Sequence, residues 1–196
     1  AANQLRDVDL LDRLIRYALQ EIGNPFSANS IVRFLQSENR RTSVDTVLNY
    51  LRACEEAFLL TKVDRVDLQG KQRLRVGEKY YAADHGFREA LVGGNQQQIQ
   101  AVLENIVFRE LLSRGFTVQV GQNKKREVDF VAQRGDERLY IQVSYLLASP
   151  ETEEREFSAF EGIFDHYPKL LLSLDPVDRS RHGIIHRNLM DFLMEN

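Results

Sequence analysis

Two stretches in the second half of the chain decide the fold: Arg126-Glu127-Val128-Asp129-Phe130-Val131-Ala132 and Leu139-Tyr140-Ile141-Gln142-Val143-Ser144-Tyr145. Both are rich in the apolar and β-branched residues of strands, and the turn residues Arg134-Gly135-Asp136-Glu137 lie between them. The pattern predicts two neighbouring strands that form a hairpin. Asp129 and Gln142 then lie at the ends of these strands, where polar side chains of both can meet.

A helix with regular apolar spacing precedes this hairpin and carries Glu104. Its pattern runs from Ile99 to Ser113, and Gly115 ends it. The expected elements after the helix are a strand at 116–120, the two hairpin strands, a helix at 151–167, strands at 169–174 and 183–186, and a closing helix at 189–194. Phe157, Phe160, Ile163 and Phe164 are expected on one face of the helix at 151–167. Helix, three strands, helix and strand is the core order of PD-(D/E)XK nucleases, so the second half is predicted to have this restriction-endonuclease-like α/β fold.

In such a site an Asp is followed by a Glu or Gln on the next strand, and oxygen ligands hold a magnesium ion. Asp129 is the expected shared metal ligand, Gln142 can add its side-chain carbonyl, and Val143 can add a backbone carbonyl. Glu104 is expected to hold a metal-bound water. The sequence therefore predicts Mg²⁺ at Glu104, Asp129 and Gln142.

The lysine of this motif is missing, because its position two residues after Gln142 is occupied by Ser144. The lysine stabilises the attacking hydroxide and the negative charge that develops on phosphate, a contribution of a few kcal/mol. A serine hydroxyl donates a hydrogen bond without charge. Lys124 and Lys125 are the only obvious substitutes by position. Whether the protein cleaves nucleic acid therefore depends on the replacement of this lysine by Ser144.

Each of these residues also has a simpler interpretation. Glu104 can be a surface carboxylate of a helix, Asp129 can pair with Arg126, and Gln142 can be a buried amide. The acidic run from Glu151 to Glu156 is interpreted as a solvated helix start that suits the helix dipole. The three polar residues at this spacing are more specific together than any one alone.

The first half predicts a winged helix-turn-helix. Helices are expected at 10–19, from Ser27 or Asn29 onward, and at 44–57, with strand segments at 59–63, 74–76 and 79–82. Thr42 and Asp45 have the spacing of a capping box for the third helix. Residues expected to be buried by that helix are Val47, Leu48, Leu51, Cys54 and Phe58. A short helix at 84–91 follows, and the break at 93–98 divides the chain into domains 1–94 and 95–196.

In a winged helix the third helix can enter the major groove while the hairpin touches phosphates. The residues expected to contact nucleic acid are Arg40, Arg41, Thr46, Asn49, Arg52, Lys71 and Arg73. Arg65 and Arg75 add to the basic wing. The alternative is a protein-interaction module in which Arg40 and Arg41 form a solvated loop, since fold alone does not assign function.

The amino-acid composition limits the classes of function that the chain can have. The chain has 196 residues and a formal net charge of −3; residues 1–94 carry +1 (14 Lys and Arg against 13 Asp and Glu), and residues 95–196 carry −4 (12 against 16). Bulk charge therefore does not favour nucleic-acid binding, and any such surface must be local. No apolar run suits a membrane span or signal peptide, so a cytoplasmic protein without membrane contact is expected. The single Cys54 is expected to be a buried apolar residue.

The whole chain resembles the C-terminal region of a large group of bacterial and archaeal AAA+-like ATPases. The residues that carry the resemblance are Phe26-Ser27-Ala28-Asn29-Ser30-Ile31, Ser43-Val44-Asp45-Thr46-Val47, Lys79-Tyr80-Tyr81, Leu103-Glu104-Asn105-Ile106-Val107, Glu127-Val128-Asp129-Phe130-Val131 and Ile141-Gln142-Val143-Ser144-Tyr145. The resemblance implies a P-loop ATPase domain before a winged helix and a nuclease-like domain of unknown function. The chain itself has no P-loop, so ATP is expected only in that preceding domain, whose loss fits a chain that begins without methionine.

Three functions remain open from the sequence. The first is a DNA-binding fragment of such an ATPase, with a degenerate nuclease-like domain and the ATPase domain as its own partner. The second is an active Mg²⁺-dependent DNA endonuclease. The third is a module that binds a protein partner or regulates the ATPase.

Overall fold

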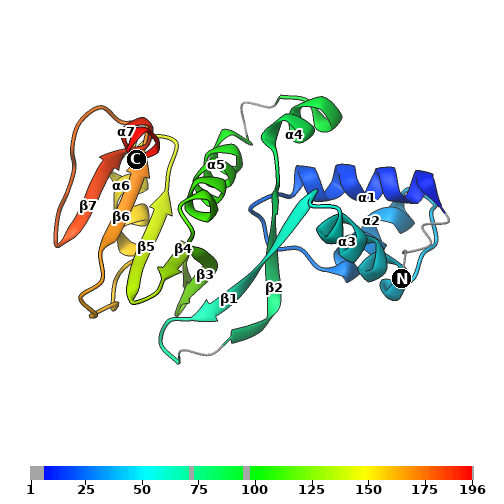
Figure 1. Cartoon of the computed structure of the whole chain (residues 1–196), viewed down its shortest axis with the longest axis horizontal. Helices are drawn as coiled ribbons and strands as arrows, with labels where there is room; N and C mark the ends of the chain where they lie inside the picture. The colour runs from blue at the N-terminus through cyan, green and yellow to red at the C-terminus, as the bar shows by residue number, and fades with distance from the viewer. Residues whose placement is uncertain (1–6, 71–72, 95–97, 196) are drawn as a thin grey trace. The chain divides into compact units, whose positions relative to one another are not determined.

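A computed structural model describes residues 7–70, 73–94 and 98–195 of the chain (Figure 1). The chain has a mixed α/β fold, in which helices come first and a seven-stranded sheet with interspersed helices follows. The sheet has the strand order β2-β1-β3-β4-β5-β6-β7. Among the described residues, no helix combines the length and the apolar character needed to cross a lipid bilayer.

Two compact units divide the chain, and the division does not follow a single cut. The first unit comprises Ala1–Val63 and Arg75–Asn95, and the second comprises Asp64–Leu74 and Gln96–Asn196. The first strand of the sheet, β1 (Leu60–Asp67), thus contributes residues to both units. The outer part of the hairpin formed by β1 and β2 (Arg73–Ala82) belongs with the second unit.

The first unit contains the three expected helices, α1 (Val8–Gln20), α2 (Ala28–Ser37) and α3 (Val44–Glu56), and then α4 (His85–Val92) after the hairpin. Side-chain caps explain where these helices begin, because an oxygen at the N-cap accepts a backbone N–H that the helix leaves unpaired. Asp7, Ser27, Ser43 and Asp84 provide these caps.

Two details of α3 were predicted wrongly. The cap is Ser43, whose Oγ accepts from the N–H of Thr46, and not a box formed by Thr42 and Asp45. Leu48 and Phe58 were expected in the core, but 46% and 81% of their surfaces are exposed. Phe58 lies past the helix end with a φ of 56°, which turns the chain away from the helical period. Cys54 is buried as expected, and burial raises the pKa of its thiol to about 11.

The second unit begins its regular structure with α5 (Ile99–Ser113), followed by β3 (Thr117–Asn123), β4 (Arg126–Arg134) and β5 (Glu137–Val143). These three strands are antiparallel, and β5 then pairs in parallel with β6 (Lys169–Ser173) and β6 with β7 (Ile184–Asn188). On the other side, β3 pairs in parallel with β1, where Arg65 lies opposite Val120. The closing helix α7 (Leu189–Met194) has the predicted bounds.

A β-bulge interrupts the pairing of β3 and β4 at Asp129, the expected metal ligand. Gln119 pairs with Val131 and Gly121 with Val128, so Asp129 and Phe130 together oppose one residue of β3. Bulges of this kind redirect side chains beside functional sites. A β-carbon on Gly121 would lie 2.9 Å from a methyl of Val131, so this position must be glycine for the strands to approach.

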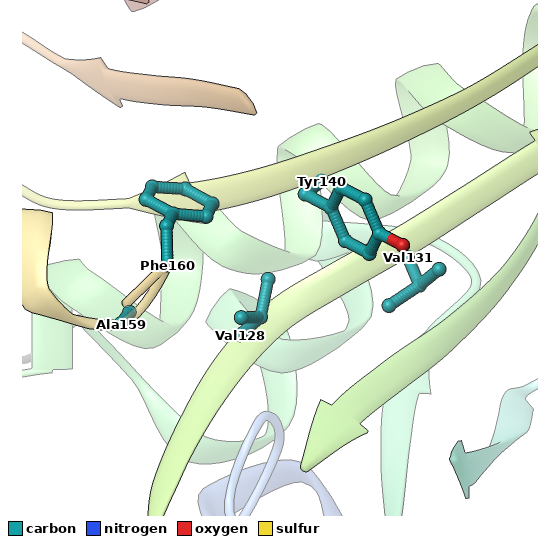
Figure 2. Packing of buried hydrophobic residues seen from close by; sticks show 5 residues of the cluster. All are labelled: Val128, Val131, Tyr140, Ala159 and Phe160. Carbon is teal, nitrogen blue, oxygen red and sulfur yellow. The ribbon is translucent and has the colours of Figure 1, made fainter. Parts of the chain in front are cut away.

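The two faces of β4 are covered by different parts of the chain. Phe130 packs toward α5, where its ring lies 6.1 Å from that of Phe108. The opposite face carries a buried cluster of Val128, Val131, Tyr140, Ala159 and Phe160 (Figure 2). Since β4 is covered on both faces, its residues 128–132 are all buried, as expected for the central strand of a core.

Helix α6 (Pro150–Ser158) is shorter than predicted. The apolar period of the sequence continues to Phe164, but that side chain is 95% exposed and Gly162 has a φ of 81°. Asn123, which is distant in sequence, bonds the chain just past this end. Its Nδ2 donates to the carbonyl of Ala159 at 2.9 Å and to that of Glu161 at 2.7 Å. These bonds satisfy carbonyls that continued helix would have used.

Candidate functional site

A cavity of about 630 Å³ opens where β4 and β5 separate between α5 and α6. The predicted residues Glu104, Asp129, Gln142 and Ser144 all line it. Glu104 lies on α5, and Asp129 lies on β4. Gln142 is near the end of β5, and Ser144 is the first residue after that strand. Other polar residues that line it include Gln100, Arg126, Glu127, Arg155 and Glu156.

Asp129 and Gln142 are each bonded to the backbone of the opposite strand. The N–H of Val143 donates to Asp129 Oδ2 at 2.9 Å, and the N–H of Asp129 donates to Gln142 Oε1 at 3.2 Å. These side-chain bonds take over where the regular ladder ends, since the last backbone pair of β4 and β5 on this side is Phe130 with Ile141. The two side chains therefore connect the strand ends beside the cavity.

Both ends of the Gln142 amide form hydrogen bonds with the protein. Its Nε2 donates to Glu156 Oε2 at 2.9 Å, while its Oε1 receives the bond from Asp129. Glu156 in turn accepts from Arg155, at 3.0 Å to Nε. The alternative interpretation of Gln142 as a bonded structural amide is thus compatible with this geometry. Glu156 is buried, so the interpretation of the acidic run 151–156 as wholly solvated was wrong for this residue.

Gln100 ties the first turn of α5 to the end of β5. Its Nε2 donates to Glu104 Oε1 at 3.1 Å and also to the carbonyl of Val143, and its Oε1 accepts from the N–H of Tyr145 at 2.8 Å. Sequence reasoning missed this residue. The available signal was its spacing, because a residue four positions before Glu104 lies on the same face of a helix.

Ser144 lies just past the strand, and not within it as predicted. Its N–H donates to the carbonyl of Leu172 at 2.8 Å, and its Oγ lies 3.5 Å from the carbonyl of Leu146, a weak contact. Lys124 and Lys125 do not line the cavity. The cations that do are Arg126, bonded to the carbonyl of Ser158 at 2.9 Å and to Glu161, and Arg155.

The oxygens expected to bind magnesium each accept a hydrogen bond from the protein. Mg²⁺ needs oxygen ligands at 2.0–2.1 Å in near-octahedral geometry. Here Asp129 Oδ2, Gln142 Oε1, Glu104 Oε1 and the carbonyl of Val143 each accept from a protein N–H group. Within the described part of the chain, no group of three or more His, Cys, Asp or Glu side chains is placed to hold a metal ion.

The residues predicted to contact nucleic acid differ in their exposure and in their contacts within the protein. Arg41, Asn49 and Arg52 are exposed. Arg40 forms ion pairs with Asp7 and Asp9, and the hydroxyl of Thr46 bonds that of Ser43 at 2.9 Å. These two are thus occupied within the first unit.

The predicted wing is described only in part. Lys71 lies outside the described residues, and of Arg73 and Arg75 only the backbone in β2 is described. Arg65 bonds Gln122 and forms an ion pair with Glu127 at 2.9 Å, so it is engaged in the second unit. The described basic surface of the first unit is therefore restricted to Arg41 and Arg52 among the predicted residues.

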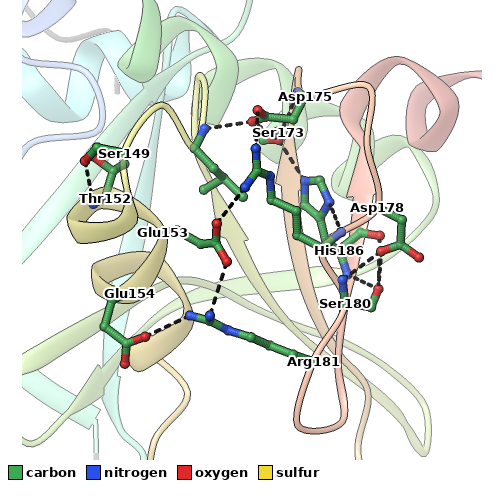
Figure 3. A network of polar contacts seen from close by, with 12 residues as sticks. Ser149, Thr152, Glu153, Glu154, Ser173, Asp175, Asp178, Ser180, Arg181 and His186 are labelled. Carbon is green, nitrogen blue, oxygen red and sulfur yellow. Dashed lines mark hydrogen bonds and ion pairs between the residues drawn. The ribbon is translucent and has the colours of Figure 1, made fainter.

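A second polar network lies between α6 and the ends of β6 and β7 (Figure 3). Ser173 Oγ lies 2.8 Å from His186 Nε2 and 2.8 Å from Asp175 Oδ2. Burial lowers the pKa of His186. Burial opposes ionisation of Asp175, but bonds from the Leu147 N–H and the Ser173 hydroxyl, together with Arg179, lower its pKa. These bonds hold β6, β7 and the segment that connects them, so a structural role is sufficient to explain the network.

A family model described as a domain of unknown function (DUF8612) matches residues 1–98, half of the chain. The chain belongs to the DUF8612 family. Among its relatives, an uncharacterized protein of Haemophilus influenzae is 36% identical over 169 residues, which cover 86% of this chain and 42% of that protein. The uncharacterized protein MJ1544 of Methanocaldococcus jannaschii is 27% identical over 163 residues, 81% of this chain and 36% of its own length. No solved structure matches the chain.

The DUF8612 match covers the first unit and the hairpin, whereas the cavity residues follow it. The relatives extend beyond the match, so the chain spans less than half the length of each. Both relatives are longer proteins of which this chain corresponds to one part.

Proposed function

We propose that this chain is the DNA-binding part of a longer, ATPase-type protein. In this proposal the first unit is a winged helix-turn-helix. The second unit has the restriction-endonuclease-like fold, with a site whose cleavage is lost or much reduced. The DNA-binding part would act in the cytoplasm with the ATPase domain of the same protein as its partner.

The observation that carries this proposal is the state of the amide at the acidic position of the motif. Gln142 uses its oxygen for the N–H of Asp129 and its nitrogen for Glu156, so it holds the strand ends instead of a cation. Ser144 adds no positive charge where a nuclease has lysine. A site in which Gln142 bonds the protein at both ends of its amide, and in which serine replaces the lysine, supports binding over cleavage.

The element order of the second unit supports the same proposal. Helix α5, the three antiparallel strands, α6 and the parallel β6 follow the order expected for the nuclease-like core. In the first unit, three helices and then a hairpin follow the layout of a winged helix, and the bridge between Pro25 and Lys79 adds a third short strand position. Exposed Asn49 and Arg52 lie on α3, the helix that such modules place in the major groove.

The test is fluorescence anisotropy of the full 196-residue chain with duplex, forked and single-stranded DNA over a series of salt concentrations. We expect affinity to fall steeply with salt, because phosphate contacts release counterions. Arg52→Ala should weaken binding to every DNA and reduce the salt slope by about 1. Arg109→Ala removes the same charge from an exposed position of α5 and serves as the matched control.

The same samples are incubated with Mg²⁺ or Mn²⁺ to measure cleavage. Binding without cleavage is expected. Cleavage by the wild type that is lost in Asp129→Ala would instead establish an active nuclease despite Ser144. An absence of salt-dependent binding on all three DNAs would overturn the proposal.

A second candidate, a protein-interaction module, is favoured by one observation on the first unit. Phe58 and Leu48 are large apolar side chains exposed at the end and on the surface of α3. Large apolar side chains exposed on a surface are candidate contacts for a protein partner. Sequence-independent DNA binding that Phe58→Ser leaves unchanged would count against this candidate.

A further inference from the structure

The side chain of Gln100 occupies a position between two oxygens that a nuclease would direct at its metal. Its Nε2 contacts both Glu104 Oε1, at 3.1 Å, and the carbonyl of Val143. The first oxygen belongs to the expected holder of a metal-bound water, and the second is the expected backbone ligand. One donor nitrogen thus bridges the helix and the strand that a cation would bridge.

The chemistry of a primary amide suits this role. An amide NH₂ group has two N–H donors on a neutral group, so it can satisfy two oxygen acceptors at once. A divalent cation also attracts both oxygens, but at a much shorter distance of 2.0–2.1 Å for Mg²⁺. The oxygen end of Gln100 is fixed as well, because it accepts from the N–H of Tyr145 at 2.8 Å. Three bonds therefore hold the amide in one orientation.

The charged residues that line the cavity also explain why a hydrogen-bond donor is needed at the position of Gln100. Glu104, Glu127, Asp129 and Glu156 line the cavity with only Arg126 and Arg155 as cations. Both arginines donate to other groups, Arg155 to Glu156 and Arg126 to Ser158 and Glu161. Without a donor at the position of Gln100, the buried carboxylate of Glu104 and the carbonyl of Val143 would each lose one hydrogen bond.

We propose that the amide of Gln100 replaces the metal ion of this site, so that the second unit is held together at the cavity without a divalent cation. This inference rests on the nuclease-like interpretation of the second unit under the proposed function, but it does not require that the chain bind DNA. Gln100 is a positioning residue here, because it acts on Glu104 and on the end of β5.

The test is thermal unfolding of the full chain with Mn²⁺ as the probe, in wild type and in Gln100→Glu. The substitution exchanges the donor for a carboxylate next to Glu104 and the carbonyl of Val143, which creates repulsion without metal and an oxygen-rich site with it. We expect the wild-type Tm to change by less than about 1 °C at 1 mM Mn²⁺, while the variant unfolds at a lower temperature in EDTA and regains at least about 3 °C with Mn²⁺. Gln36→Glu, at an exposed position of α2, makes the same charge change and should show no response.

Two results would overturn the inference. One is a Mn²⁺ response of the wild type as large as that of Gln100→Glu, since the amide would then not exclude a cation. The other is the absence of a Mn²⁺ response in the folded Gln100→Glu variant, since no cation position would then exist there.

A second variant keeps the test decisive if Gln100→Glu does not fold. Gln100→Ala removes the donor without adding charge, so it should lower the Tm in EDTA and regain at least part of the loss with Mn²⁺. A folded Gln100→Ala with no Mn²⁺ response would overturn the inference in the same way. Because no DNA is present, failure of the DNA-binding proposal and failure of this inference give separate results.

Discussion

At the scale of single residues, His186 shows how a buried titratable group can be fixed in one protonation state by its neighbours. Its Nδ1 accepts from the N–H of Arg179 at 3.1 Å, so the neutral ring carries its proton on Nε2. That nitrogen can then donate to Ser173 Oγ, and the serine hydroxyl can donate to Asp175. A second proton on the ring would remove the acceptor for Arg179.

This arrangement predicts a pH dependence of stability. Burial lowers the pKa of His186 below its ordinary value of 6.5, although Asp175 and Asp178 oppose the shift and Arg179 adds to it. The unfolded chain therefore binds a proton at a higher pH than the native chain does. The contribution is complete above pH 6.5 and falls as the pH decreases through 6.5 toward the native pKa, by at most about 1.4 kcal/mol per pH unit.

The measurement is urea unfolding at pH 7 and pH 5 for wild type and His186→Gln. We expect the variant to be less stable at pH 7 but to lose less stability between the two pH values. His182→Gln, at an exposed position, is the control and should keep the wild-type slope. Equal slopes in wild type and His186→Gln would contradict the prediction.

At the scale of elements, the bulge of β4 connects the packing of the sheet to the candidate site. Asp129 and Phe130 oppose a single residue of β3, and Gly121 beside them lets the strands approach. The added β-carbon of Gly121→Ala would meet side chains of Val131 and Val128 at 2.9 and 3.2 Å. These contacts are with strands in the core, where neighbours cannot move easily.

We therefore expect Gly121→Ala to destabilise the chain by about 1–3 kcal/mol. The measurement is the midpoint of urea unfolding. Gly86→Ala is a suitable comparison, since the nearest atom to its added β-carbon is a terminal oxygen of Asp84 at 3.0 Å. A loss for Gly121→Ala no greater than that of Gly86→Ala would show that the bulge can relax.

The element scale also shows what the sequence can and cannot predict. The bounds of α5 and α7 follow from apolar period and end signals nearby, and were predicted correctly. The bounds of α6 were predicted too long, although Gly162 is a local stop signal; the bonds from Asn123, which lies in β3 and comes close only in the folded chain, could not be predicted. Helix propensity is a weak signal that tertiary contacts of this kind override.

The candidate site divides in the same way. Glu104, Asp129, Gln142 and Ser144 line one cavity, although the sequence alone left open whether Glu104, Asp129 and Gln142 meet in space. The partners of these residues could not be derived, since Glu156 lay in a run that has the composition of a solvated helix. Hydrogen-bond partners depend on side-chain directions at the bulge, which no local pattern records.

At the scale of the whole molecule, residues 64–74 belong with a unit whose remaining residues begin at position 96. Leu68 donates its N–H to the carbonyl of Gln122 at 2.9 Å, and its side chain packs on the cluster of Val128 and Val131. A substitution early in the sequence should thus affect the later unit.

We expect Leu68→Ala to lower the stability of the second unit by about 1–3 kcal/mol, since its side chain is only partly buried. Hydrogen exchange measured by mass spectrometry should show faster exchange in β3 and β4 and unchanged exchange in α1, α2 and α3. Leu48→Ala, on the exposed surface of α3, is the control and should leave both regions unchanged. Faster exchange confined to α1, α2 and α3 would contradict this assignment of residues 64–74.

The chain passes between the two units three times, after Val63, after Leu74 and after Asn95. Suppose that the second unit is exchanged between related genes at one junction near residue 95. The segment that carries Arg65 and Leu68 would then stay with the original gene, and β3 would pair with a β1 from a different protein. Hybrids with two exchanged segments keep that pairing intact. The hairpin thus sets where chimaeras of such proteins can be joined, because residues 64–74 must be exchanged together with the rest of the second unit.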